Sequence, residues 1–213
     1  LALYGHNTQP WAVVVSARDR WTVGVDPTRR LPGVDPDDRE TVIYLGTFLE
    51  NLAVAARALG REVSVDLLSE RRDAPALYEV RLASRPPEGE AMVGRIETRR
   101  TLRADYRDDP LAPADRDALL AAGGDAAFFP AGSREARWLR EAAVESFRAQ
   151  SGRDDAQAEL QRWIRFGAEE VRAKRDGMNP RTMELGFLAR LWMERFMDAS
   201  SVMTQDFRRR GVE

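Results

Sequence analysis

The sequence contains no cysteine, a single histidine and a single lysine among its 33 basic residues. Without cysteine, disulfides, thiolate metal sites and cysteine nucleophiles are all excluded. A Ser-His-Asp triad or a histidine-based metal site would have to be built around His6 alone, so we expect no metal and no such triad. Because every basic residue except Lys174 is an arginine, an individual arginine says less about function here than usual.

The chain also has little net charge, −2 at pH 7, with 33 basic against 35 acidic residues. No net field would therefore draw it onto a nucleic acid or an anionic membrane. No apolar run approaches the roughly 20 residues that span a bilayer, and the first residues lack the pattern of a secretory signal. We expect no nucleic-acid partner, no membrane insertion and a cytoplasmic location. Since the sequence starts at Leu1 without a methionine, an exported form stays open and we expect a fragment.

What the chain does have is a globular composition, with 213 residues of which 43% are hydrophobic. Two β-branched runs at 12–16 and 21–26 predict a hairpin, and residues 62–68 and 77–83 are again strand-like. Between them, Asp37 and Asp38 offer N-cap carboxylates to a long helix that ends near Gly60. Hydrophobic residues cover most of its circumference, so we expect a central helix buried on several sides, with close packing at Gly46.

The second part of the sequence is richer in helical patterns. A linker rich in proline, glycine and glutamate at 84–90 leads into it, and we place one half at residues 1–95 and the other at 96–213. Helices are expected at 91–98 and 113–122, a strand at 126–130, and mostly helix from Ser133 onward. The fold class is therefore α+β, with a mixed or antiparallel sheet flanked by helices.

The first segment with a chemical signature is the heptapeptide at residues 5–11, Gly-His-Asn-Thr-Gln-Pro-Trp. A flavin presents carbonyl acceptors and an N3 donor along one edge, and the amides of Asn7 and Gln9 each offer a donor and an acceptor to match. His6 could position a substrate or serve only in packing. The alternative for the whole segment is a loop whose polar groups satisfy one another before a strand begins.

The second segment, at residues 99–103, places three arginines and a threonine next to the expected end of a helix. The planar guanidinium group matches phosphate oxygens bidentately, so Arg99, Arg100, Thr101 and Arg103 suit a phosphate group. In a chain this rich in arginine, the alternative is a solvated charged face. The phosphate interpretation depends on the pairing of this segment with the first.

Together the two segments resemble the nitroreductase superfamily, in particular its Acg-type branch of single-chain proteins. Residues 5–11 are similar to its flavin-contacting signature, and residues 99–103 to its Arg-Arg-Ser/Thr-x-Arg phosphate motif. Further similarity in order and spacing lies at residues 26–32, 35–40 and 45–52. Leu3 and Tyr4 stand where the branch usually has Pro-Ser, which removes a hydroxyl contact.

The resemblance implies a fused pseudo-dimer of two half-domains that holds one FMN, monomeric or else a homodimer. Asn7 and Gln9 would face the isoalloxazine ring and His6 and Gly5 would line it. The phosphate would be held by Arg99, Thr101 and Arg103, with Arg100 beside them. Electrons would pass from NAD(P)H through the flavin to a small electron-poor acceptor, a nitroaromatic or a quinone, and no catalytic group is required from the chain itself.

Two alternatives to this function stay open. One is a protein that holds flavin without turnover under a lid, and the loop at 176–180 could form such a lid or simply cap a helix. The other is a degenerate paralogue without flavin, which Leu3 and Tyr4 favour. The aromatic residues of the helical part are expected to be core rather than flavin contacts; they are Trp163, Phe166, Trp192 and Phe196.

Overall fold

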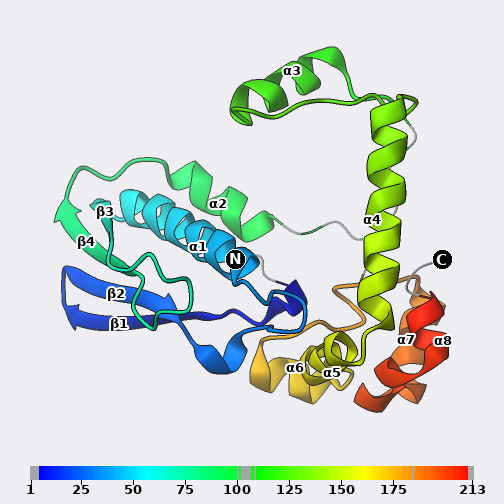
Figure 1. Cartoon of the computed structure of the whole chain (residues 1–213). Helices are drawn as coiled ribbons and strands as arrows, with labels where there is room; N and C mark the ends of the chain where they lie inside the picture. Colours follow the sequence, from blue (N-terminus) through cyan, green and yellow to red (C-terminus); the bar gives the residue numbers. More distant parts are fainter. Residues whose placement is uncertain (1–4, 100, 102–106, 108, 184, 211–213) are drawn as a thin grey trace.

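The structure is a computed structural model that describes residues 5–99, 101, 107, 109–183 and 185–210 (Figure 1). It is an α+β fold with one four-stranded antiparallel sheet, and the described part of the chain forms eight α-helices. The sheet and its covering helices lie at one end of the molecule, and the helices from residue 134 onward lie at the other (Figure 1). The α+β class expected from the sequence is confirmed.

The sheet consists of β1 (Trp11–Ala17), β2 (Arg20–Val25), β3 (Arg61–Leu67) and β4 (Tyr78–Ser84), in the order β1-β2-β4-β3. All its neighbours are antiparallel, and the register pairs Val13 with Val23 and Val65 with Val80. The predicted hairpin and the two later strands are therefore confirmed. β1 continues directly from the polar segment at residues 5–10.

Helix α1 (Arg39–Ala58) packs on one face of this sheet and forms the main core with it. Leu45 and Leu49 of the helix are buried against Val23 and Val80 of the strands. Helix α2 (Glu90–Thr98) lies alongside α1. The expectation of burial on several sides is wrong: Ile43 is 56% exposed, because the sheet and α2 cover only part of the helix surface. The expected close packing at Gly46 is likewise not found, since a Cβ built there would meet no atom of the described residues within 4 Å.

The start of α1 differs from the prediction that Asp37 and Asp38 cap it. Asp38 occupies the N-cap position, but its backbone is left-handed and its side chain pairs with Arg30 instead of a helix N–H. The capping carboxylate is Asp35, which accepts bonds from the backbone N–H of Glu40 at 3.0 Å and of Thr41 at 2.9 Å. The sequence pattern thus predicts the helix correctly, but the residue that caps it is Asp35 and not Asp37 or Asp38.

Replacing Asp35 by alanine is expected to lower the free energy of unfolding by about 2 kcal/mol, because two helix N–H groups lose their acceptor in a buried place. Urea titration followed by circular dichroism measures the change. Asp37→Ala is the matched control, since Asp37 is exposed and caps nothing. Equal losses in the two variants would contradict this assignment of the cap.

The second half is mostly helical. After α3 (Pro113–Ala122) comes the long helix α4 (Arg134–Gly152), which points away from the sheet and has α3 at its far end (Figure 1). The strand predicted at residues 126–130 is wrong. This stretch is exposed and has no regular structure, and it pairs with no strand in the described chain.

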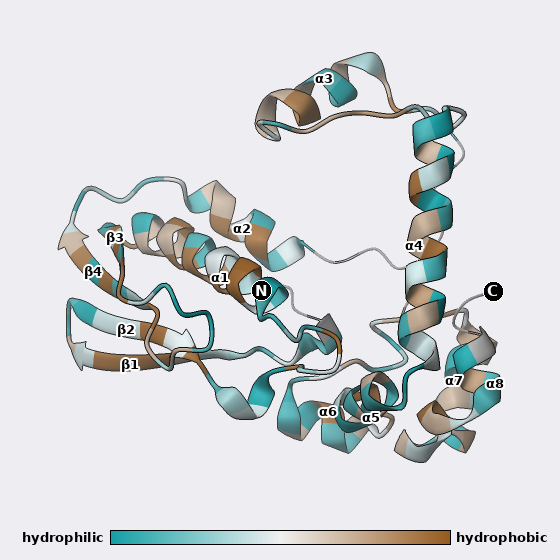
Figure 2. Cartoon of the chain, in the orientation of Figure 1, coloured by the Kyte–Doolittle hydropathy of each residue, from teal (hydrophilic) through white to brown (hydrophobic). Residues whose placement is uncertain are grey.

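Shorter elements complete the helical part: α5 (Asp154–Trp163), α6 (Ala168–Lys174), α7 (Phe187–Phe196), the 3₁₀ helix η3 (Ala199–Met203) and α8 (Gln205–Arg210). Figure 2 shows hydrophobic residues on α4 and α7 as well as on the sheet. On α4, Trp138 is 64% exposed, and on α7, Leu188 is 78% exposed. Within the described ranges, no helix has the length and apolar character needed to cross a membrane.

A second, smaller core joins the helical part to the loop that precedes α1. Leu31 of this loop is fully buried together with Trp163, which is 5% exposed, at the end of α5. The Glu159 carboxylate of α5 accepts hydrogen bonds from the backbone N–H of Gly33 at 2.7 Å and of Val34 at 3.1 Å. This junction brings the end of α5 and the segments after it toward the beginning of the chain.

Candidate functional site

The polar turn at the beginning of the described chain has an unusual backbone. Gly5–Asn7 form the 3₁₀ helix η1, and three residues that are not glycine have positive φ: His6 at 56°, Asn7 at 54° and Gln9 at 55°. Residues other than glycine and asparagine are disfavoured in this left-handed region. Where surrounding contacts hold a residue in it, that residue is often part of a functional site. We call residues 5–9 the amide turn.

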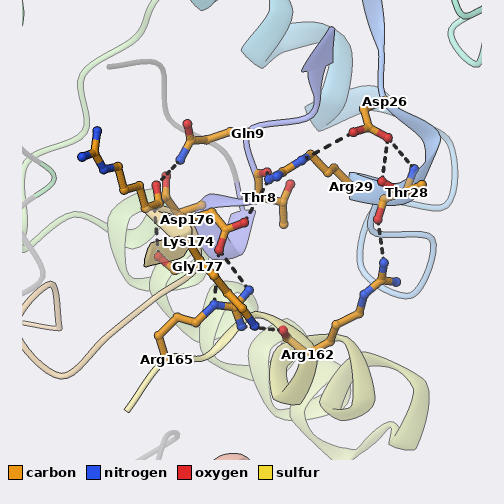
Figure 3. Close-up of polar contacts among 12 residues, drawn as sticks. Thr8, Gln9, Asp26, Thr28, Arg29, Arg162, Arg165, Lys174, Asp176 and Gly177 are labelled. Carbon is orange, nitrogen blue, oxygen red and sulfur yellow. Dashed lines mark hydrogen bonds and ion pairs between the residues drawn. The ribbon is translucent and has the colours of Figure 1, made fainter. Parts of the chain in front are cut away.

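The amide turn is held by a segment far along the chain, residues 175–177, directly after α6. The Asn7 side-chain amide donates to the carbonyl oxygen of Gly177 at 3.0 Å, and the Gly177 N–H donates back to the Asn7 carbonyl oxygen at 3.0 Å. The Gln9 amide donates to the carbonyl oxygen of Arg175 at 2.8 Å (Figure 3). We call residues 175–177 the clamp segment. It overlaps the loop at 176–180 for which the sequence left a lid or a helix cap open.

The backbone of the clamp segment is constrained as well. Arg175 ends α6 in the left-handed region, with φ of 53°, and Gly177 has φ of 76°. A Cβ atom on Gly177 would lie 2.3 Å from the Trp163 carbonyl oxygen, so only glycine fits. The next residue, Met178, forms a parallel bridge with Ile164, which fixes the segment beside the end of α5.

A cluster of charged side chains lies between the amide turn and the helical part (Figure 3). The Arg29 guanidinium donates to the Thr8 carbonyl oxygen at 2.7 Å and to the Asp176 carboxylate at 3.0 Å. Arg165 donates to the other oxygen of the Asp176 carboxylate at 3.0 Å and 3.2 Å. Arg165 and Asp176 are both buried, with side chains 6% and 8% exposed.

These arginines surround the indole ring of Trp163. The guanidinium carbons of Arg29, Arg162 and Arg165 lie 5.5 to 5.7 Å from its ring centroid. Trp163 is thus a buried core residue, as expected from the sequence. Trp192 and Phe196 are not, because they are 51% and 70% exposed on α7.

The only histidine lies in the amide turn with its ring largely buried. Among the described residues, its Nε2 atom has no hydrogen-bond partner, and the same is true of the buried Oγ1 atom of Thr8. Burial lowers the pKa of His6 from its ordinary value of 6.5 to about 4. His6 is therefore neutral at pH 7, and its ring offers one N–H donor and one nitrogen acceptor.

The arginine segment follows the end of α2. Arg99 is the C-cap residue of that helix, and its N–H donates to the Arg95 carbonyl oxygen at 2.9 Å. Thr101 is half-buried, and its buried Oγ1 atom has no partner in the part of the chain that the structure describes. Arg100 and Arg103 lie outside the described residues. Within the described ranges, no hydrogen bond joins the amide turn to Arg99 or Thr101, so their meeting around one ligand stays a prediction.

A cavity with a volume of about 940 Å³ lies elsewhere, between α7, η3 and α8. Its walls are mainly apolar, and none of its lining residues belongs to the amide turn or to the arginine segment. In the part of the chain that the structure describes, no group of three or more histidine, aspartate or glutamate side chains could hold a metal ion. The amide turn is distinguished by its left-handed backbone and by buried polar atoms that have no partner among the described residues.

Sequence reasoning found the amide turn and missed its supports. The sequence places Arg29 only within a longer similarity and Asp176 only at the start of a possible lid or capping loop, and it does not single out Arg165. In a sequence with so many arginines, no neighbouring residue indicates that Arg165 is buried. The only available signal was the Asp-Gly pair at 176–177, which is typical of a turn.

Comparisons with known proteins give no further assignment. A scan against protein-family models finds no matching family, and a search of curated proteins finds no significant match.

Proposed function

We propose that this chain binds FMN and passes electrons from NAD(P)H to a small electron-poor acceptor, a nitroaromatic or a quinone. The observation that carries the proposal is the position of unpartnered polar atoms. Seven buried side-chain nitrogen or oxygen atoms of described residues lack a partner, and three of them belong to the two short segments singled out by the sequence. They are His6 Nε2, Thr8 Oγ1 and Thr101 Oγ1.

Leaving such atoms unpaired costs about 1–3 kcal/mol each, so buried polar groups without a protein partner indicate a ligand or bound water. A flavin mononucleotide suits both segments because it combines a heteroaromatic edge with a phosphate group. The hydroxyl of Thr101 and the guanidinium groups of Arg99 and Arg103 would hold the phosphate. The neutral ring of His6 would line the isoalloxazine group, which supplies the redox chemistry when bound.

The amide groups also fit one edge of a flavin. The side-chain nitrogens of Asn7 and Gln9 are each bound to a carbonyl oxygen of the clamp segment. Their side-chain oxygens accept no hydrogen bond within the described part of the chain, which suits a donor such as flavin N3–H. Because the clamp segment fixes both amides, the acceptors are held in place before a ligand arrives, which lowers the entropic cost of binding.

A second candidate, a protein that holds flavin without turnover, is favoured by the same contacts. The clamp segment lies directly on the amide turn, and a segment in that place would also limit the approach of a nicotinamide. This candidate shares the flavin site and differs only in reactivity.

The experiment that tests both begins with the visible absorption of the purified protein and its titration with FMN. Yellow protein that oxidises NADH or NADPH with menadione supports the oxidoreductase. Yellow protein without this oxidation supports the second candidate. Protein that stays colourless in excess FMN would overturn both.

The phosphate assignment makes a prediction of its own. The double variant Arg99→Ala/Arg103→Ala should weaken FMN binding at least about tenfold, on the order of 1.4 kcal/mol, because two guanidinium contacts to the phosphate are lost. Quenching of flavin fluorescence measures the dissociation constant. Arg71→Ala/Arg116→Ala, which removes the same charge from an exposed and a half-buried arginine that are paired with neighbouring aspartates, is the control. Unchanged affinity in the first variant would remove the phosphate site.

A further inference from the structure

We propose that Asp176 is a positioning residue, whose carboxylate sets the conformation of the amide turn through the clamp segment. The identity of the ligand rests on the proposed function. The positioning itself is a property of this chain and can be tested without a ligand.

The first step of the argument is the place of Asp176 in the chain. It lies between Arg175 and Gly177, whose carbonyl oxygens accept the amide hydrogen bonds of Gln9 and Asn7. Any movement of the Asp176 backbone therefore moves both acceptors. Along the chain, Asp176 carries the only side chain between these two carbonyl groups, because Gly177 has none.

The second step is that the carboxylate contacts the amide turn by another route. One oxygen of Asp176 accepts from Arg29, whose same nitrogen, Nη1, donates to the Thr8 carbonyl oxygen. The clamp segment is thus connected to the amide turn twice, through the backbone of Gly177 and through the side chain of Arg29 (Figure 3). Two independent connections fix the orientation of the amide turn as well as its distance from the clamp segment.

The third step concerns the buried charges. Arg165, which is 6% exposed, directs two nitrogens to the other oxygen of Asp176. Each guanidinium group also has a second carboxylate nearby. Nε of Arg29 lies 3.5 Å from a carboxylate oxygen of Asp26, and Nε of Arg165 lies 3.6 Å from one of Glu170. Asp176 is the carboxylate that the two arginines share. Removing its charge breaks the connection between them while each arginine keeps one acidic neighbour.

The fourth step is that the amide turn needs such support. His6, Asn7 and Gln9 all have a left-handed backbone, a conformation that persists only where surrounding contacts hold it. With the clamp segment displaced, these residues would relax toward ordinary backbone angles. The unpartnered atoms of the turn would then become exposed to water.

The test uses Asp176→Asn, which keeps the size of the side chain and removes its charge. We expect FMN affinity to fall about tenfold. The single histidine supplies a direct readout of the turn, because the NMR titration of the His6 ring is unambiguous in this chain. In the variant the pKa of His6 should rise from about 4 by more than one unit toward 6.5, as the ring gains water. Asp73→Asn, in an exposed ion pair with Arg71, is the control and should change neither quantity.

A second variant guards against simple loss of folding. Arg29→Gln breaks the contacts to Thr8 and to Asp176 but leaves the buried pair of Arg165 and Asp176 intact. It should shift the titration of His6 in the same direction. Unchanged His6 titration in folded Asp176→Asn and Arg29→Gln would overturn the positioning role. Wild-type protein that binds no FMN would overturn the proposed function alone, because the His6 titration would still decide the role of Asp176.

Discussion

Replacing Gly177 by alanine is expected to lower the free energy of unfolding by more than about 3 kcal/mol and to weaken FMN binding. The new Cβ would lie 2.3 Å from the Trp163 carbonyl oxygen and 3.0 Å from Cγ of Arg165. The first of these is a backbone atom of a buried residue, so the clamp segment must move away from the end of α5. The hydrogen bonds of Gly177 to Asn7 would be lost with that movement. Urea unfolding and FMN titration measure the two effects.

Gly89→Ala separates this clash from the cost of the backbone conformation. Gly89 has φ of 79°, close to the 76° of Gly177, and a Cβ there would meet no atom within 4 Å. Alanine in the left-handed region costs about 1–2 kcal/mol, which both variants share. The difference between them therefore reports the steric clash. Similar losses in the two variants would show that the clamp segment can shift without consequence.

The sheet and its main helix could be predicted because local signals agree there with the final packing. The runs at β1 and β2 are β-branched and are separated by a charged turn, a pattern that favours a hairpin whatever surrounds it. The end of α1 is marked by Gly60, which has a positive φ of 72°. Such positions depend on neighbours in sequence, so the sequence alone suffices.

Other features of the fold depend on neighbours in space. Asp35, Asp37 and Asp38 are all plausible caps by type, and the choice of Asp35 follows from how the preceding loop turns back on the helix. Ile43 is as apolar as Leu45, yet only the latter faces the sheet. Residues 126–130 have strand-like composition but lie beside no partner strand in the described chain. The residue type limits what a side chain can do, and the packing of the fold determines which of these possibilities occurs.

The candidate site shows the same division. The amide turn was predicted because its side chains are dense in hydrogen-bonding groups. Its support was not, because Asn7 and Gln9 bind backbone carbonyl oxygens, and every residue type carries that group. The sequence separation of about 170 residues also hides the contact from any local pattern. The candidate binding groups are thus visible in the sequence, whereas the contacts that position them are visible only in the fold.

The burial of His6 predicts a specific dependence of stability on pH. Its pKa is about 4 in the folded chain and near 6.5 once the chain unfolds, so the unfolded state binds a proton first as the pH falls. Stability from this residue is fully present above pH 6.5 and is lost as the pH falls toward 4. The shift corresponds to about 3 kcal/mol when the loss is complete.

His6→Asn should remove this loss, because asparagine does not titrate and tolerates the φ of 56° at this position. We expect the wild type to lose about 3 kcal/mol more than the variant between pH 7 and pH 4, measured by urea unfolding at several pH values. Carboxylates titrate equally in both proteins and cancel in the comparison. Parallel curves would mean that the ring takes up its proton without penalty in the folded chain. The unpartnered Nε2 atom would then have to be open to water, and it would no longer support a ligand at the amide turn.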